Sequence, residues 1–214
     1  MLKKKKLKNY IKNFLNFKKL FNNPVPIYTH HKTQVDGLKL HLGCGEVNLQ
    51  GWINIDARDY KHIHMFSEDL NLNAFTENSI SEIYLCHVIE HFSYQEGCDL
   101  IKGFFGKLVN GGILRISVPD FDKIVTIYNQ NNKEMSTIKT HLMGGQNYKF
   151  NFHKSMYNKS YLIDMLEDTG FRNCVEWDPI SDFGLTLGDC SDSIIKTKKY
   201  RGPISLNIKA IAYK

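Results

Sequence analysis

The sequence has no uncharged apolar run that approaches the ~18 residues of a membrane-spanning helix, and it shows no internal repeat. These absences argue against a membrane-spanning chain, a coiled-coil array and a solenoid. The 214 residues are instead 42% hydrophobic and 23% charged, as in an ordinary globular protein. That length is enough for one domain with a sizeable buried core.

Paired cysteines are also missing. The five cysteines are odd in number and scattered, and no two form a Cys-x-x-Cys pair: Cys44, Cys86, Cys98, Cys174 and Cys190. The apolar residues that follow the first lysines are interrupted by Lys and Asn, so they do not form the apolar core of a secretory signal. We therefore expect reduced thiols and a cytoplasmic protein.

Acidic residues are absent from residues 1–35, which contain nine lysines and no arginine. This leaves 19 of the 28 basic residues against all 22 acidic residues in 36–214, so the net charge of +6 belongs to the N-terminal segment. The remainder lacks the positive face that is typical of nucleic-acid-binding proteins. We expect no nucleic-acid partner.

The lysine-rich segment has apolar residues at helical spacing, with Lys and Asn on the opposite side. This pattern predicts a basic amphipathic helix over residues 1–23, ended by Asn22-Asn23-Pro24, and a linker over 24–37. Such a helix can pack on its own domain, hold a partner or fold over an active site. It can also make peripheral contact with the inner face of an anionic membrane through residues 1–21.

From residue 38 onward, strand patterns alternate with helical patterns. Strands are predicted at 38–42, 52–56, 63–66, 82–86, 113–118, 173–177 and 206–213. Helices are predicted at 94–108, closed by Asn110-Gly111-Gly112, and at 121–131 and 160–169. The alternation predicts an α/β domain over 38–214 with a doubly wound, mostly parallel sheet, to which the last two strands add an antiparallel hairpin.

Polar residues and glycines stand at the ends of the first three predicted strands: Gly43-Cys44-Gly45, Asp56 and Glu68-Asp69-Leu70. In a parallel sheet, ligands bind at the carboxyl ends of the strands. Glycines there let the backbone approach a ligand, and an acidic residue can accept hydrogen bonds from both hydroxyls of a ribose. The third glycine of a dinucleotide site is missing, and Glu46 would face a pyrophosphate unfavourably, so a ligand without phosphates fits better.

Further motifs follow in a fixed order along the chain. They are Leu40–Gly45, Gly51–Asp56, Ser79–His91, Gly111–Asp120, Gly144–Gln146 and His153-Lys154. In this combination the sequence resembles the class I S-adenosylmethionine-dependent methyltransferases, and more narrowly the small ones of bacterial surface-polysaccharide (capsule or O-antigen) clusters. The resemblance covers residues 38–212. It implies a seven-stranded Rossmann-like fold, S-adenosylmethionine as cofactor and S-adenosylhomocysteine as product.

The resemblance also implies a cofactor site. Gly43 and Gly45 would approach the methionine part, Asp56 would bind the ribose hydroxyls, and Asp69 with Leu70 would meet the adenine. The full set of cofactor residues that it implies is Leu42, Gly43, Cys44, Gly45, Asp56, Ala57, Asp69, Leu70 and His87.

Two positions depart from the family pattern. His41 stands where the family often has an acidic residue, and Val47 replaces the usual third glycine of the loop. Both departures concern the methionine end of the expected cofactor site.

One motif has a second interpretation. His87-Val88-Ile89-Glu90-His91 is the H-x-x-E-H string of a class of zinc peptidases, in which two histidines on one helical face bind zinc and the glutamate acts as a base. A zinc-dependent hydrolase is therefore an alternative, although it leaves Gly43-Cys44-Gly45 and Asp56 unexplained. A non-catalytic cofactor-binding module is another. On the favoured interpretation no metal site is assigned.

The segment from His141 to Lys154 is rich in glycine and hydrogen-bonding side chains and lies between two predicted helices, as a lid or substrate loop does. Candidate catalytic residues are His153, His87 and Asp120, with His153 as the first choice for a general base. Candidate substrate-binding residues are Gln146, Asn151, Lys154 and His91. The expected reaction is O-methylation of a small polar acceptor, either a sugar hydroxyl or a phosphoryl or phosphoramidate group, on a small molecule or glycan precursor.

Overall fold

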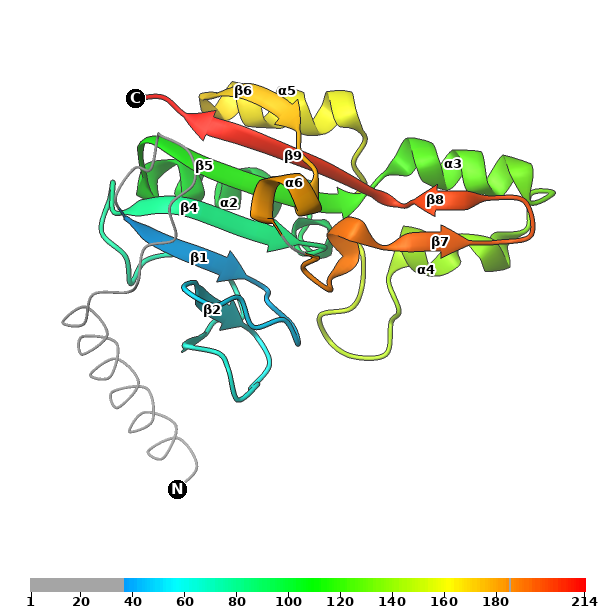
Figure 1. The fold of residues 1–214 in the computed structure, drawn as a ribbon, viewed down its shortest axis with the longest axis horizontal. Coiled ribbons are helices and arrows are strands. Elements are labelled where there is room, and N and C mark those ends of the chain that lie inside the picture. Colours follow the sequence, from blue (N-terminus) through cyan, green and yellow to red (C-terminus); the bar gives the residue numbers. More distant parts are fainter. Residues whose placement is uncertain (1–36, 185) are drawn as a thin grey trace.

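The protein is built around one seven-stranded β-sheet (Figure 1). The computed structural model describes residues 37–184 and 186–214, so the predicted helix over 1–23 and almost all of the linker over 24–37 lie outside it. Along the sheet the strands follow the order β3-β2-β1-β4-β5-β9-β6. In that order they are Met65–Phe66, Ile53–Asp56, Leu38–Leu42, Ile80–Cys86, Leu108–Pro119, Ser205–Ala212 and Phe171–Glu176.

All strands of this sheet except β9 run in the same direction. β1 pairs in parallel with β2 and β4, β2 with β3, and β4 with β5. β9 is antiparallel to both of its neighbours, β5 and β6. The expected α/β fold, a mostly parallel seven-stranded Rossmann-like sheet with an antiparallel strand at its C-terminal side, is confirmed.

The two last strands of the sheet are not joined by a tight turn. They pair antiparallel as predicted, but β9 lies between β5 and β6, and residues 177–204 separate it from β6 in the sequence. This connection contains elements that the sequence analysis missed. They are the helix α6 (Pro179–Phe183), the 3-10 turn η3 (Cys190–Asp192) and a separate antiparallel pair, β7 (Ile194–Lys196) with β8 (Arg201–Pro203).

The central strands are buried on both faces, which accounts for their nearly continuous apolar sequences. Successive side chains of a strand point to opposite faces, and the two faces have different coverings. Ile83 of β4 belongs to a cluster that includes side chains of α2 (Tyr94–Lys107) and α5 (Lys159–Thr169). Its neighbour Tyr84 belongs to a second cluster, with aromatic residues from and around α6.

Polar residues fix the ends of the long helices close to their predicted positions. Ser93 and Glu96 cap each other's backbone at the start of α2, in a capping box. Asp120 caps α3 (Phe121–Gln130), and Asn158 caps α5. α5 ends at Gly170, whose φ of +116° suits a residue without Cβ.

One predicted boundary is wrong. α2 ends at Lys107 and β5 starts at Leu108, so Asn110-Gly111-Gly112 lies inside the strand rather than in a turn before it. The connections in residues 43–79 contain no helix, so the carboxyl ends of β1, β2 and β3 are followed by loops. Two short elements, η2 (Met135–Thr137) and α4 (Lys139–Met143), lie between α3 and the predicted lid.

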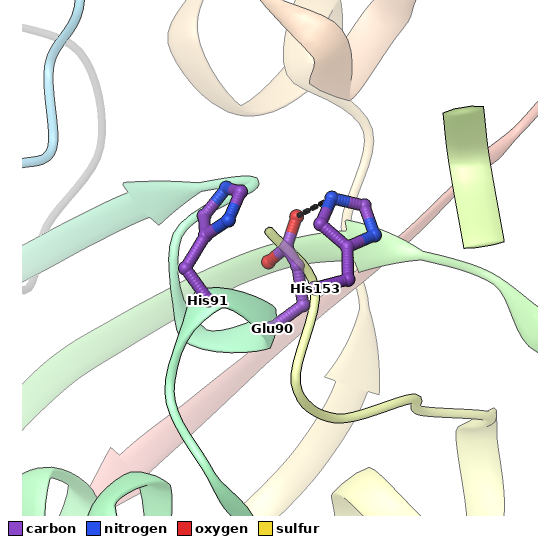
Figure 2. Close-up of side chains that lie close together, drawn as sticks. All are labelled: Glu90, His91 and His153. Atoms are coloured by element: carbon purple, nitrogen blue, oxygen red, sulfur yellow. Dashed lines mark ion pairs between the residues drawn. The ribbon is translucent and has the colours of Figure 1, made fainter. Parts of the chain in front are cut away.

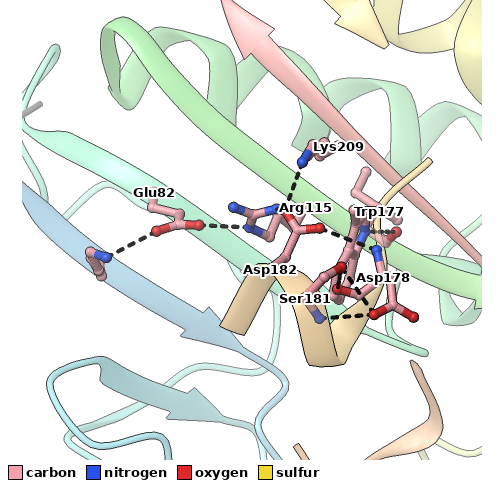
Figure 3. A network of polar contacts seen from close by, with 9 residues as sticks. Glu82, Arg115, Trp177, Asp178, Ser181, Asp182 and Lys209 are labelled. Atoms are coloured by element: carbon pink, nitrogen blue, oxygen red, sulfur yellow. Dashed lines mark hydrogen bonds and ion pairs between the residues drawn. The ribbon is translucent and has the colours of Figure 1, made fainter. Parts of the chain in front are cut away.

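A network of charges holds α6 against the sheet (Figure 3). Arg115 of β5 donates from Nε to Glu82 of β4 and from Nη1 to Asp182 of α6, each at 2.7 Å. Asp182 also accepts from Lys209 of β9 at 2.6 Å, and Lys39 of β1 lies 3.1 Å from Glu82. Every charge of the network has an opposite charge beside it.

Two expectations from composition concern the whole fold. All five cysteines are free thiols. In the part of the chain that the structure describes, no helix combines the length and the apolar character that crossing a bilayer requires.

Candidate cofactor and acceptor site

The loop after β1 has the backbone that its glycines predict. Gly43 and Gly45 have φ values of +60° and +56°, in the left-handed region that side chains with a Cβ rarely adopt. A Cβ at Gly43 would lie 2.4 Å from Cγ2 of Val88, in the segment that follows β4. Glycine at this position therefore lets the loop after β1 pack directly against the end of β4.

Asp56, at the end of β2, is joined to that loop. Its side chain is buried, with 5% of the residue exposed, and Oδ2 accepts a hydrogen bond from the Gly45 N–H at 2.8 Å. Oδ1 accepts from the Arg58 N–H at 2.7 Å. A carboxylate has about four acceptor positions, so two bonds from the main chain leave capacity for ribose hydroxyls. The structure thus brings together the two strand ends that the sequence analysis paired.

The other predicted cofactor residues line or support this edge. Leu42 is fully buried in β1, and Ala57 directly follows Asp56. Burial, together with the charge of Asp56, raises the pKa of the Cys44 thiol to about 12, so this cysteine is protonated and unreactive. After β3, Asp69 accepts from the Ser67 hydroxyl at 3.2 Å, and Leu70 has a left-handed φ of +51°.

His87 occupies a strained position directly after β4. Its φ is +53°, and its backbone N–H donates to the Ser117 carbonyl at 2.8 Å. The Ser205 hydroxyl donates to the Cys190 carbonyl at 2.6 Å, so at 2.8 Å from His87 Nε2 it accepts the proton of that nitrogen. The other ring nitrogen, Nδ1, is then a lone pair. Burial lowers the pKa of His87 to about 3, which keeps the ring neutral.

The H-x-x-E-H string does not form the zinc-peptidase arrangement. After His87 the chain makes the 3-10 turn η1 (Ile89–His91) rather than an α-helix, so His87 and His91 do not share a helical face. His87 Nε2 is bound to Ser205 on β9. The zinc-hydrolase alternative, in the form that pairs His87 with His91, is therefore wrong.

The structure instead gathers Glu90, His91 and His153 (Figure 2). Glu90 and His91 come from η1, whereas His153 comes from the predicted lid. Nε2 of His153 lies 3.9 Å from Oε1 of Glu90, and the two imidazole rings meet edge to face with centroids 4.9 Å apart. One nitrogen or oxygen from each residue lies within 4.8 Å of the others.

Burial dominates the electrostatics of this group. Glu90 is 1% exposed, and burial raises its pKa to about 8. Burial lowers the pKa of His91, and it lowers that of His153 to about 4, with a further contribution from His91. In the sequence, Glu90 has a predicted role only in the hydrolase alternative, and no local pattern places His153 beside it.

The lid keeps its shape through its own hydrogen bonds. The His153 N–H donates to the Met143 carbonyl at 3.1 Å, and the Gln146 N–H donates to the Asn151 carbonyl at 2.8 Å. The amide side chains of Gln146 and Asn151 also bond within the loop. Lys154 lies 3.8 Å from Glu96 in an exposed pair. Contacts inside the protein thus engage all three predicted substrate residues of the lid, and their role toward a substrate stays a prediction.

The tip of the lid reaches the loops after β2 and β3. The guanidinium of Arg58 lies 4.8 Å from the ring centres of both Tyr60 and Tyr148, and Lys149 of the lid pairs with Glu68 at 2.7 Å. At its other end, the lid is held by the Lys154 N–H, which donates to the Glu90 carbonyl at 2.8 Å. The lid therefore spans from the Glu90 side of this edge of the sheet to the Asp56 side.

Asp120 does not join the group of Glu90, His91 and His153. Its Oδ1 accepts from the Asp122 N–H at 3.1 Å at the start of α3, and Oδ2 lies 3.3 Å from Lys123. These contacts account for Asp120 as a helix cap, and its predicted catalytic role remains untested.

Comparisons with known proteins agree with this architecture. A SAM-dependent methyltransferase of Methanosarcina mazei matches with a TM-score of 0.53 and 14% identity, over 85% of this chain and 94% of that one. One of Archaeoglobus fulgidus matches with 0.52 and 15%, over 82% and 86%. The chain has the fold of the SAM-dependent methyltransferases. No protein-family model matches the sequence, and a search of curated proteins gives no significant match.

A third similar structure contains a ligand. The 1,6-didemethyltoxoflavin-N1-methyltransferase of Burkholderia thailandensis, with bound S-adenosylhomocysteine, matches with a TM-score of 0.50 and 13% identity, over 83% of this chain and 71% of that one. At such identities the similarity concerns the fold. Polysaccharide clusters do not appear among these matches, so that narrower part of the resemblance is taken up below as a proposal.

Proposed function

We propose that this protein is an S-adenosylmethionine-dependent methyltransferase. The observation that supports this most strongly is the bond between the two loops at the carboxyl edge, in which Gly45 N–H donates to Asp56 Oδ2 at 2.8 Å. A glycine loop and a buried carboxylate at adjacent strand ends fit the adenosyl and methionine parts of the cofactor. The fold, which it shares with SAM-dependent methyltransferases, supports the same assignment.

The cofactor supplies a methyl group on a positively charged sulfur, which leaves as a neutral thioether. In the reaction the carbon–sulfur bond breaks, a carbon–oxygen bond forms, and the proton of a hydroxyl acceptor passes to a base. The protein mainly has to align acceptor and methyl group and to exclude water. Asp56 and the glycine loop would hold the cofactor, and the lid, tied to both sides of the edge, would close over it.

The acceptor we propose is a small polar molecule that binds beside His91, Glu90 and His153. This group adjoins the glycine loop through Val88, which would meet a Cβ at Gly43. A sugar hydroxyl or a phosphoryl or phosphoramidate oxygen of a surface-glycan precursor fits the polar surroundings. Support for the polysaccharide context comes from the sequence resemblance alone.

The lysine-rich N-terminal segment suggests a place for that reaction. We propose a cytoplasmic protein that touches the inner face of the membrane through residues 1–21, since nine lysines and no acidic residue lie in residues 1–35. Sedimentation with vesicles of anionic or neutral lipid tests this. The full chain should bind anionic vesicles and a chain lacking residues 1–23 should not, whereas equal binding of both would contradict the proposal.

Calorimetric titration with S-adenosylhomocysteine tests the cofactor site. Asp56→Ala should weaken binding by about 1–3 kcal/mol, because hydrogen bonds to a buried carboxylate are lost. Asp59→Ala, an exposed aspartate of the same loop, is the matched control and should bind like the wild type. Unchanged affinity in Asp56→Ala would mean that the ribose binds elsewhere.

Turnover is tested by release of S-adenosylhomocysteine with a panel of nucleotide sugars and phosphorylated precursors. Release of S-adenosylhomocysteine with any of these acceptors supports the proposal that the protein is an enzyme. Cofactor binding without turnover on any acceptor would favour the non-catalytic module. With a productive acceptor, His153→Ala should slow transfer while cofactor affinity stays near that of the wild type.

A further inference from the structure

The group of Glu90, His91 and His153 contains acceptors without donors. Neither carboxylate oxygen of Glu90 has a hydrogen-bond partner within the described residues, although the side chain is 1% exposed. An unpaired buried oxygen of this kind is costly. The residues around Glu90 indicate why the protein keeps these unpaired oxygens.

Main-chain carbonyl oxygens contact one ring nitrogen of each nearby imidazole. Nδ1 of His91 lies 3.2 Å from the Phe152 carbonyl, and Nδ1 of His153 lies 3.1 Å from the His141 carbonyl. A carbonyl can only accept, so in His153 Nδ1 carries the hydrogen and Nε2, which lies toward Glu90, is the lone pair of a neutral ring. Bonds from Nδ1–H to carbonyl oxygens are the usual way in which proteins orient histidines that bind metals.

A further lone pair faces the same carboxylate. Nδ1 of His87, whose proton sits on Nε2 toward Ser205, lies 3.6 Å from Oε1 of Glu90. On its other side, Oε1 lies 3.9 Å from Nε2 of His153. A carboxylate oxygen placed between nitrogen lone pairs is stabilised by a positive charge among them or by a proton on the carboxyl group.

From this convergence we infer a binding site for one divalent transition-metal ion, with one ring nitrogen of His91, Nε2 of His153 and a carboxylate oxygen of Glu90 as its ligands. Two imidazoles with one carboxylate suit Zn²⁺, Fe²⁺, Co²⁺ and similar ions, whereas Mg²⁺ and Ca²⁺ prefer oxygen ligands. Three protein ligands leave at least one coordination position open for an oxygen atom of another molecule.

The spacing of the three atoms allows this with small movements. Atoms no more than 4.8 Å apart share a centre within about 2.8 Å of each, so bonds of ~2.0–2.2 Å need inward shifts of ~0.7 Å. His153 belongs to the lid, and Glu90 and His91 belong to the turn after β4. Metal binding would therefore also fasten the lid to the sheet.

Titration calorimetry with ZnCl₂ alone, on the chelator-treated full chain without cofactor, tests the site. The wild type should bind one equivalent that His153→Ala and Glu90→Gln lose or bind at least tenfold more weakly. His141→Ala, a histidine of the same segment outside the ligand group, should retain it. Circular dichroism verifies that each variant is folded, and the visible spectrum of the Co²⁺-loaded wild type should change in His153→Ala.

Two results would overturn the inference. In the first, the wild type binds no zinc that the variants lack, and Glu90 is then a carboxyl that keeps its own proton. In the second, His141→Ala loses the ion as His153→Ala does, and the ligands are then different residues.

A part for this ion in methyl transfer rests on the function proposed above. With an open position beside the methyl group, it would bind the acceptor oxygen and lower the pKa of a hydroxyl there. A chelator should then abolish transfer and leave the affinity for S-adenosylhomocysteine unchanged. If S-adenosylhomocysteine does not bind at all, the methyltransferase proposal fails, while the zinc titration still decides whether the metal site exists.

Discussion

Two buried glutamates of this protein have opposite surroundings. Glu82 lies among Arg115 and Lys39, and Asp182 beside it is paired in turn with Arg115 and Lys209 (Figure 3). Glu90 is the more deeply buried of the two, yet within the described residues neither of its oxygens has a hydrogen-bond partner, and His153 lies beside it (Figure 2).

The difference separates a structural group from a site. In the Arg115 network, every buried charge is balanced by residues of the chain, so nothing has to be added to it. Around Glu90 the chain leaves acceptors unbalanced, which destabilises the fold and is retained where a ligand or a reaction uses it. Asp56 stands between these cases, because main-chain N–H groups satisfy part of its carboxylate.

The largest effect is expected in the balanced network. Arg115→Ala should lower the free energy of unfolding by about 3–5 kcal/mol, because it leaves Glu82 and Asp182 buried without their shared partner. Lys39→Ala removes a half-exposed partner of the same glutamate and should cost about 1 kcal/mol or less. Urea unfolding measures both, and equal losses would show that burial does not distinguish the two pairs.

The next prediction concerns His41, a buried imidazole that has a hydrogen-bond partner but carries no charge at neutral pH. Burial lowers the pKa of His41 to about 4, although its Nδ1 lies 3.1 Å from Oδ1 of Asn54. The unfolded chain takes up this proton near pH 6.5, so stability is full above that pH and falls as the pH approaches 4. The loss from this one group is about 3 kcal/mol at most.

His87 and His153 act in the same direction, so the comparison requires a variant of His41 itself. Urea unfolding at pH 7 and pH 4.5 should show a smaller acid loss in His41→Gln than in the wild type. Parallel stability curves for the two proteins would mean that His41 takes up its proton at the same pH in the folded and unfolded chains.

Replacing each glutamate by methionine should change stability in opposite directions. Glu90→Met removes unpaired buried oxygens and should stabilise the metal-free protein by about 1–3 kcal/mol. Glu82→Met leaves Arg115 with one carboxylate fewer and should destabilise the folded protein. Thermal unfolding in the presence of a chelator measures both. A loss of stability in Glu90→Met would show that a hydrogen-bond donor satisfies Glu90 in the folded protein.

The smallest effect is expected from the contact between Tyr148 of the lid and Arg58, which follows β2 at the carboxyl edge of the sheet. Tyr148→Ala removes the lid side of the stack on Arg58 and should weaken binding of S-adenosylhomocysteine by roughly twofold to fivefold, the value of an exposed cation–π contact. Phe152→Ala, another exposed aromatic of the lid, serves as the control. Equal affinities in all three proteins would mean that this contact does not help to close the lid.

Local sequence was sufficient for much of the fold. Ser93 with Glu96, and Gly170 at the other end of the domain, mark helix ends where the structure has them. Capping and chain reversal depend on a few neighbouring residues, so they can be predicted without tertiary information. The stop assigned to Asn110-Gly111-Gly112 failed because pairing with β4 and β9 extends β5 back to Leu108.

Local sequence likewise predicts some residues of the candidate site and not others. Gly43, Gly45 and Asp56 could be predicted because parallel strands end at a common edge, which brings neighbouring strand ends together whatever the rest of the chain does. His87 and His91 share a conspicuous string, yet a left-handed residue and a 3-10 turn keep them from sharing a helical face. The insertion with α6, β7 and β8 had no periodic pattern to reveal it.

The alternating strands and helices, the glycine loop and its carboxylate follow from local sequence alone, because periodicity and strand ends are local properties of the chain. The arrangement of the whole fold brings His153 to Glu90 and His91, and it leaves Glu90 without a hydrogen-bond donor among the described residues. Which buried side chains contact one another depends on how the lid packs against the end of the sheet. Whether a charge is balanced depends on every element packed around it.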